Sequence, residues 1–414
     1  MRVRLVVVVL VLVAVNLFAF NPPVLCAQEK GPIKIGYIIP VTGAFAEVGR
    51  DMTNGTAMFL EEIGYRAGGR KIELITEDDE ANPATGLTKL RKVVEKDGVH
   101  IVAGVFLAST GYAFNPYLEE KQVPANYQIC SADDLTQRKK ARWVVRTSWT
   151  SSQHSHPFAE YVYKVLGYRK IATMGMDYAF GWEAIGGFQR TFEEMGGKII
   201  QKTWTPITAV DFSPYLGNIR KDADAVYTVY VGRPGLIFAK QYKEYGLKDK
   251  IPLLSVGPMT DENVLPSMGD DALGILNALH YSAAIDTPAN QKFVKAYREK
   301  FKRAPSYFAE GAYTGSRWIV EAIKLTGGDV ENKEKFLAAM RKVVITDAPR
   351  GPIKVDDFGN PIQNTYIRKV EKVGGEHQNT VIQTIPNISQ FWKYNPEEYL
   401  KQPLYSRDYP PLKP

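Results

Sequence analysis

The chain has 414 residues, of which 45% are hydrophobic, 11% aromatic and 23% charged, and its formal net charge is +7. This composition is typical of a globular protein that can bury sizeable cores, and the length suggests about two or three domains. The mild positive charge is spread along the chain without a dense basic run, which argues against a nucleic-acid partner.

The first residues have the pattern of a secretory signal peptide. Arg2 and Arg4 precede an apolar run over Leu5–Phe20, and a small residue follows shortly before position 28. We therefore expect residues 1–27 to be cleaved during export to the periplasm, with an uncleaved or lipid anchor as the less favoured alternative. After that cleavage only Cys130 remains, so the pattern predicts no intrachain disulfide.

The stretch 33–61 predicts a buried strand, a glycine loop and a helix. An apolar run ends at Pro40, Gly43 and Gly49 lie in the loop, and a helical pattern follows. Open α/β sheets place their ligands at such loops, beside a helix N-terminus that favours an anion. No Walker lysine follows Gly49, so a small carboxylate or a neutral polar ligand fits better than a phosphate.

Alternating strand and helix patterns continue along the chain. Further strands are predicted at 71–77, 100–103, 123–129 and 143–146, and then at 170–175, 198–205, 225–230 and 252–256, with helices between them that include 212–221. Two successive runs of this kind predict an α/β protein with two parallel sheets covered by helices. The last third predicts helices at 288–301, 307–325 and 333–343, strand-like segments up to residue 385, and a tail rich in proline and tyrosine.

Several short motifs occur in a characteristic order. They are PVTG at 40–43 with Gly49, EDD at 77–79 with NPA at 82–84, the loop 104–111, DDLTQ at 133–137, and the segment 177–182. In this order the chain resembles the periplasmic substrate-binding proteins of ABC importers, of the branched-chain amino-acid (leucine/isoleucine/valine-binding-like) type. The resemblance covers about residues 32–385.

The resemblance implies the type I periplasmic-binding-protein fold, with two doubly wound parallel-sheet lobes joined by three hinge crossings. Lobe 1 would comprise residues 33–146 plus 283–347, lobe 2 residues 147–282 plus 348–385, and a C-terminal tail residues 386–414. The lobes would close on a small solute and deliver it to the membrane subunits of an ABC permease. The protein would act as a monomer without cofactor or metal.

Two other classes of function were weighed. A ligand-sensing receptor module of the same fold would have the same sequence features. An enzyme of this architecture is disfavoured, because the chain has no G-x-S-x-G, H-E-x-x-H or G-x-G-x-x-G motif. His154 and His156 form the only close histidine pair and lack a nearby third metal ligand. Cys130 has no obvious base partner for a nucleophilic role.

The family holds a ligand carboxylate with hydroxyls and main-chain groups from two loops. Carried onto this chain, the loops supply Ala108, Ser109, Thr110, Cys130 and Ser131. Ser109 would also begin a helix and add its dipole. An N-cap role without a ligand remains the alternative for either serine.

An aromatic wall is also implied by the resemblance. The first-loop position that is often Tyr or Trp in the family is Val48 here, and Phe45 could replace it. The other expected wall residues are Phe106, Tyr178, Phe180 and Tyr230. These side chains suit the apolar or aromatic body of a ligand.

A second departure concerns the carboxylate that pairs with a ligand ammonium in amino-acid binders. The matching position falls on Met259, which leaves an ammonium without its partner, unless Asp261 or Glu262 replaces it. We therefore favour an aromatic or hydrophobic carboxylate as ligand. A branched-chain or other amino acid, or an amide, stays open as the alternative.

Overall fold

The first sheet is built around β1 (Ile33–Ile39), in which every residue except Lys34 is buried. In the computed structural model, which describes residues 30–413, β1 pairs in parallel with β3 (Arg70–Asp78) and β4 (Ile101–Gly104). The six-stranded order is β2-β3-β1-β4-β5-β6, completed by β2 (Arg66–Ala67), β5 (Ala125–Tyr127) and β6 (Val144–Arg146). The near-continuous burial of β1 fits a strand covered on both faces.

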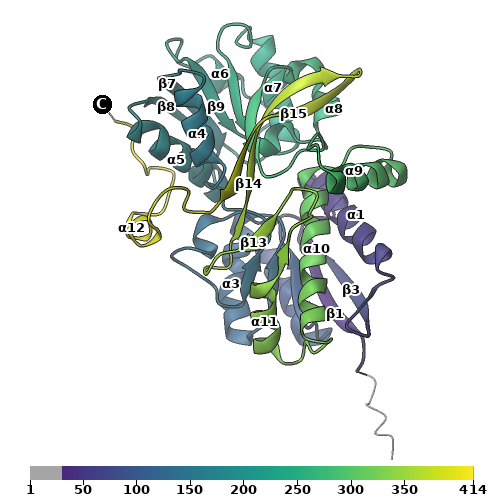
Figure 1. The fold of residues 1–414 in the computed structure, drawn as a ribbon. Helices are drawn as coiled ribbons and strands as arrows, with labels where there is room; N and C mark the ends of the chain where they lie inside the picture. The colour runs from purple at the N-terminus through teal and green to yellow at the C-terminus, as the bar shows by residue number, and fades with distance from the viewer. Residues whose placement is uncertain (1–29, 414) are drawn as a thin grey trace, which may run out of the picture. The chain divides into compact units, whose positions relative to one another are not determined.

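Helices from two distant parts of the chain pack on this sheet. The early ones are α1 (Ala46–Glu62), α2 (Pro83–Arg91) and α3 (Ala108–Lys121), with short turns η1 (Gly43–Phe45), η2 (Lys92–Lys96) and η3 (Asp133–Leu135). The late ones are α10 (Tyr307–Leu325) and α11 (Lys333–Lys342). Figure 1 shows α10 beside α1. A Cβ at Gly55 of α1 would lie 1.9 Å from the Ala309 carbonyl oxygen, so only glycine permits this close approach.

The second sheet has nine strands. Its parallel part contains β7 (Lys170–Met176), β8 (Lys198–Thr205), β9 (Ala225–Val229), β10 (Leu253–Val256) and β11 (Leu276–Leu279). The antiparallel part contains β12 (Val344–Ile345), β13 (Ile353–Val355), β14 (Pro361–Val373) and β15 (Glu376–Ile388). The order is β12-β13-β14-β11-β10-β9-β7-β8, and β15 pairs with β14. The expected parallel sheet therefore carries an antiparallel addition.

The remaining helices are α4 (Ser155–Lys164), α5 (Ala179–Glu194), α6 (Ser213–Leu216), α7 (Arg233–Glu244), α8 (Leu265–Met268), α9 (Pro288–Phe301) and α12 (Pro396–Lys401), with turns η4 (Gly257–Thr260) and η5 (Gly269–Ala272). The helix expected at 212–221 is only the single turn α6. It ends at Gly217, and the exposed Arg220–Asp222 pair that follows lies in a turn.

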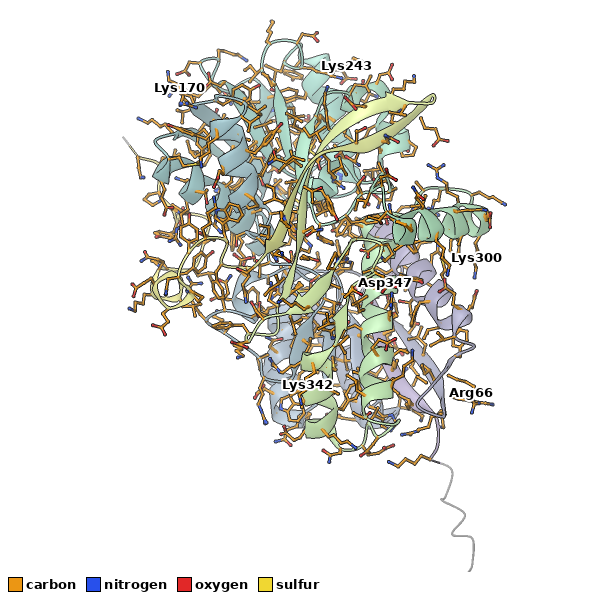
Figure 2. The ribbon with its side chains drawn as sticks, viewed as in Figure 1. Arg66, Lys170, Lys243, Lys300, Lys342 and Asp347 are labelled. Atoms are coloured by element: carbon orange, nitrogen blue, oxygen red, sulfur yellow. The ribbon has the colours of Figure 1, made fainter. Side chains whose placement is uncertain are left out.

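Several lysine side chains extend into solvent. The labelled Lys170 and Lys243 extend outward from the second-sheet region, and Lys300 extends from α9 (Figure 2). No helix in residues 30–413 has the length and apolarity to cross a membrane. The predicted signal peptide lies outside the described residues.

Candidate ligand-binding site

A small cavity lies where strands of both sheets end. We call it the inner cavity; it encloses about 260 Å³ of space, part of it open to solvent. Its lining consists of Phe106, Ala108, Ile129, Ser131, Trp149, Tyr178, Phe180, Val231 and Tyr307. Except for Tyr307, which begins α10, these residues follow the carboxyl ends of β4, β5 and β6 in one sheet and of β7 and β9 in the other, where α/β sheets bind ligands.

One end of the inner cavity offers neutral hydrogen-bond donors. Helix α3 begins at Ala108 without a side-chain cap, so its first main-chain N–H groups face outward from the helix end. The single proton of the Ser151 hydroxyl is shared between the main-chain oxygen of Ser131 (2.8 Å) and its Oγ (3.1 Å). The Ser131 hydroxyl donates no hydrogen bond within the described residues and can donate to a ligand.

Trp149 supplies a further donor. Its Nε1 is buried and has no hydrogen-bond partner within the described residues, which costs free energy that a ligand oxygen would recover. Its ring packs edge-on against Phe180, with centroids 5.8 Å apart. The ring of Trp149 therefore forms part of the aromatic wall while its N–H remains available.

Two buried histidines support this wall from behind. His154 stacks on Trp149 at 5.1 Å, and His280 packs edge-on against Tyr307 at 5.8 Å. His154 Nε2 lies 3.1 Å from His280 Nδ1, and its Nδ1 lies 2.7 Å from Thr365 Oγ1. Burial lowers the pKa of His154 to about 3, so the pair is neutral at pH 7. No group of three metal-ligating side chains occurs within residues 30–413.

The structure brings only some of the residues expected from the sequence to the inner cavity: Phe106, Ala108, Ser131, Tyr178 and Phe180. Phe45 and Val48 instead line a neighbouring space, the outer cavity described below.

Three further expected residues lie beside the inner cavity without lining it. Ser109 is half-buried in the first turn of α3, and Thr110 behind it is buried. The Cys130 thiol is packed so closely that a Cβ on Gly111 would lie 2.5 Å from its sulfur. Burial raises the pKa of the Cys130 thiol to about 11, which suits a packing role and no nucleophilic one.

Tyr230 and Met259 are not brought to the inner cavity. Tyr230 stacks on Phe238 at 4.8 Å in the core of the second sheet. Met259 is fully buried there, and its sulfur accepts a hydrogen bond from Thr228 Oγ1 at 3.1 Å. Both side chains point into this core, Tyr230 in ring contact with Phe238 and Met259 in its hydrogen bond with Thr228. Met259 therefore does not decide the charge of the ligand.

The alternative carboxylates also lie elsewhere. Asp261 Oδ1 accepts from the Tyr307 main-chain N–H at 3.2 Å, and Glu262 Oε1 accepts from the Ala283 N–H at 3.2 Å. Neither residue lines the inner cavity. Its lining contains no charged side chain.

Sequence reasoning missed Ile129, Trp149, Val231 and Tyr307. Val231 directly follows a correctly predicted strand, so its position at a carboxyl end was a usable signal. Trp149 has the same signal, because it closely follows β6, whereas Tyr307 has none, because it reaches the cavity from the start of a distant helix.

Comparisons with known proteins agree with this architecture. A family model described as periplasmic binding protein matches residues 32–376, and the chain belongs to this family. Its fold is the type I periplasmic-binding-protein fold, and the expected likeness to leucine/isoleucine/valine-binding proteins is confirmed. The family and its solved relatives are binding proteins of ABC transporters.

Three relatives illustrate the likeness. The chain is 32% identical over 360 residues to "Leu/Ile/Val-binding protein homolog 6" of Brucella suis, covering 85% of this chain and 91% of the relative. A solute binding protein of an ABC transporter from Rhodopseudomonas palustris BisB5, in complex with 3,4-dihydroxy benzoic acid, is 33% identical with a TM-score of 0.83, covering 87% and 99%. A solute binding protein from Rhodopseudomonas palustris HaA2, in complex with p-hydroxybenzoic acid, is 31% identical with a TM-score of 0.82, covering 87% and 98%.

Proposed function

We propose that this protein captures a small aromatic carboxylate by lobe closure and delivers it to an ABC permease. The observation that carries the proposal is the uncharged, largely aromatic lining of the inner cavity. Aromatic side chains suit the planar ring of an aromatic ligand.

The ligand carboxylate would lie at the donor end of the inner cavity. Ser131 Oγ, the first N–H groups of α3 and Trp149 Nε1 are the groups that would hold it. Neutral dipoles and a helix N-terminus stabilise an anion in a dry site without a full positive charge. The hydroxyls of Tyr178 and Tyr307 are available for a ring substituent.

The same lining disfavours a free amino acid. Burying an ammonium without a carboxylate partner costs free energy. The two candidate carboxylates, Asp261 and Glu262, accept main-chain hydrogen bonds outside the inner cavity. Two similar solved proteins hold hydroxylated benzoic acids, which supports the same class of ligand here.

The wider assignment follows the family. Lobe 1 would comprise residues 33–146 plus 283–347 and lobe 2 residues 147–282 plus 348–385, closing about the hinge crossings. A monomer exported by cleavage of residues 1–27 would carry the ligand through the periplasm without chemical change. The alternative to delivery to a permease is a ligand-sensing role, in which a receptor binds the same closed state.

A branched-chain amino acid is the second candidate ligand. The 32% identity to a protein named as a Leu/Ile/Val-binding homolog favours it. The two candidates differ in the ammonium group, so binding assays separate them directly.

The test is a ligand panel on protein that has been unfolded and refolded to remove any co-purified ligand. Thermal shift and calorimetry would compare benzoate, 4-hydroxybenzoate, 3,4-dihydroxybenzoate, benzamide, leucine and phenylalanine. We expect the benzoates to stabilise the protein, by about 2.7 kcal/mol at 100 times Kd, and the amino acids to have little effect. Tight leucine binding with no response to any benzoate would overturn the proposal. Recovery of unchanged ligand after incubation would distinguish binding from catalysis.

A further inference from the structure

A second, larger cavity adjoins the inner one. This outer cavity encloses about 1200 Å³ of space, part of it open to solvent. On one side it is lined by the loop and helix start at 43–48 with Arg50 and Arg303, and on the other by Gly232, Arg233, Leu236, Asn263, Val264 and Ser267. Elements associated with both sheets therefore form its walls.

The two cavities are immediate neighbours. Val231 lines the inner cavity and Gly232 lines the outer one. Phe45 of the outer cavity packs against Phe106 of the inner cavity, with ring centroids 5.1 Å apart. This ring contact connects the linings of the two spaces, and the outer cavity opens to solvent.

The charges around the outer cavity favour an anion. Its lining contains three guanidinium groups and one carboxylate, Glu47. Arg50 pairs with Glu47, and Arg303 pairs with Glu47 and with the buried Asp51 behind it. Arg233 is exposed and has no ion pair or hydrogen bond within residues 30–413, so its positive charge is uncompensated.

Asn263 adds a neutral polar group. Its amide Nδ2 and Oδ1 are both shielded from solvent, and neither has a hydrogen-bond partner in the described part of the chain. An amide left in this state costs free energy that a polar ligand at the cavity wall would recover. Arg233 begins α7 and Asn263 precedes α8, and both line this cavity.

We propose that the outer cavity is an anion-binding subsite in which Arg233 and Asn263 hold the carboxylate of an incoming small organic acid before its ring passes Phe45 into the inner cavity. The inference rests on the proposed function for the identity of the final ligand. A guanidinium attracts and can hold a carboxylate in two parallel hydrogen bonds, and an uncompensated charge at the mouth of a cleft accelerates association.

The test measures association kinetics by stopped-flow tryptophan fluorescence, because Trp149 lines the inner cavity. The probe is 4-hydroxybenzoate, with uncharged benzamide as its comparison, at about 0.01 M and about 0.15 M salt, where the Debye length is roughly 30 Å and 8 Å. We expect Arg233→Gln to lower kon for the acid roughly threefold or more at low salt, with koff changed much less. Arg233→Lys should restore most of the rate, and Asn263→Ala should increase koff from the first bound state.

Lys240→Gln is the matched control. It removes one positive charge from an exposed position on the same helix, α7, outside the cavity lining, and should leave kon unchanged. Equal kon in wild type and Arg233→Gln at low salt would overturn the subsite while leaving the proposed function intact.

A second readout does not depend on the organic ligand. Chloride itself should exchange at Arg233, so the ³⁵Cl NMR line of NaCl should be broader with wild type than with Arg233→Gln, and Lys240→Gln should match wild type. If no carboxylate binds, the proposed function is wrong, but the chloride line width still tests whether Arg233 forms an anion-binding subsite. Equal line widths in the three proteins would overturn it.

Discussion

Ser109 and Ser131 are equivalent candidates in the sequence, but the structure separates them. Ser131 lines the inner cavity, and its hydroxyl donates no hydrogen bond within the described residues. Ser109 is half-buried in the first turn of α3 and does not line the cavity. Any contribution of Ser109 would come through its main-chain N–H, which alanine retains.

Single alanine substitutions should therefore differ. Ser131→Ala should weaken binding of 4-hydroxybenzoate by about 10-fold or more, because a hydrogen bond to a charged group contributes roughly 1.5–3 kcal/mol. Ser109→Ala should change Kd less than about threefold. Calorimetry on both variants checks this, and equal losses of affinity would mean that both hydroxyls bind the carboxylate, contrary to this assignment.

A buried carboxyl pair links elements of the two sheets. Glu183 on α5 accepts hydrogen bonds from Tyr112 Oη and from the Asp133 main-chain N–H, each at 3.0 Å. Burial raises the pKa of Asp133 to about 6, and burial together with the charge of Asp133 raises the pKa of Glu183 well above its usual value. The contact between Glu183 and the Asp133 segment is therefore most stable when these two carboxyl groups retain a proton.

This pair makes stability depend on pH. Between pH ~4 and ~6 the unfolded chain has lost the Asp133 proton while the folded protein still binds it, so the free energy of unfolding should fall as pH rises. The part of this loss that is due to Asp133 amounts to at most about 3 kcal/mol. Asp133→Asn should remove this part of the pH dependence in urea unfolding. The exposed Asp249→Asn serves as control, and parallel profiles for Asp133→Asn and wild type would refute the assignment.

At the scale of elements, the start of α5 determines where the aromatic wall lies. A Cβ at Gly181 would lie 1.9 Å from the Met176 carbonyl oxygen, so the helix can begin this close to the end of β7 only with glycine. Phe180, the preceding residue, is thereby held in the inner cavity.

Gly181→Ala should lower the free energy of unfolding by about 1–3 kcal/mol and weaken ligand binding, because α5 must move away and carry Phe180 with it. Gly217→Ala is the matched control: its Cβ would meet nothing within 4 Å and its φ is −62°. That control should change stability by less than about 1 kcal/mol. Chemical denaturation and calorimetry measure both effects; a neutral Gly181→Ala would contradict the close approach.

At the scale of the whole described chain, the C-terminal tail joins elements from both sheet regions. Arg138, just after η3, donates to the Tyr399 carbonyl at 3.0 Å and the Gln402 carbonyl at 2.9 Å. Further along the tail, Gln189 on α5 donates to the Pro411 carbonyl at 2.9 Å. Figure 1 shows α12 (yellow) close to α5. The sequence did not determine whether this tail packs against the rest of the protein or frays. In the structure it packs against these elements.

Arg138→Gln should lower the free energy of unfolding by about 1–2 kcal/mol, because two carbonyls in the tail lose a charged donor. Arg142→Gln is the control, since its ion pair with Glu334 is solvent-exposed on both sides and contributes at most about 1 kcal/mol. Urea unfolding and limited proteolysis of the tail would measure the difference. Equal stability of the two variants would show that the tail contributes no net stabilisation at Arg138.

The sequence by itself determined the α/β class, the two successive sheets, most strand and helix positions and the loops where a ligand would bind. Those features follow from apolar spacing and turn residues over ten to twenty positions, so they are present locally in the chain. The expectations for Phe106, Ala108, Ser131, Tyr178 and Phe180 came from the family resemblance, and each of these residues lies just after a predicted strand.

Only the tertiary structure decided which of these loops meet. Trp149 and Tyr307 come to one cavity from segments more than a hundred positions apart, while Met259 turns into the core towards Thr228. Contacts at such separations depend on how the strand ends of two sheets face each other and on which polar atoms find partners nearby. No local spacing of residue types encodes that choice.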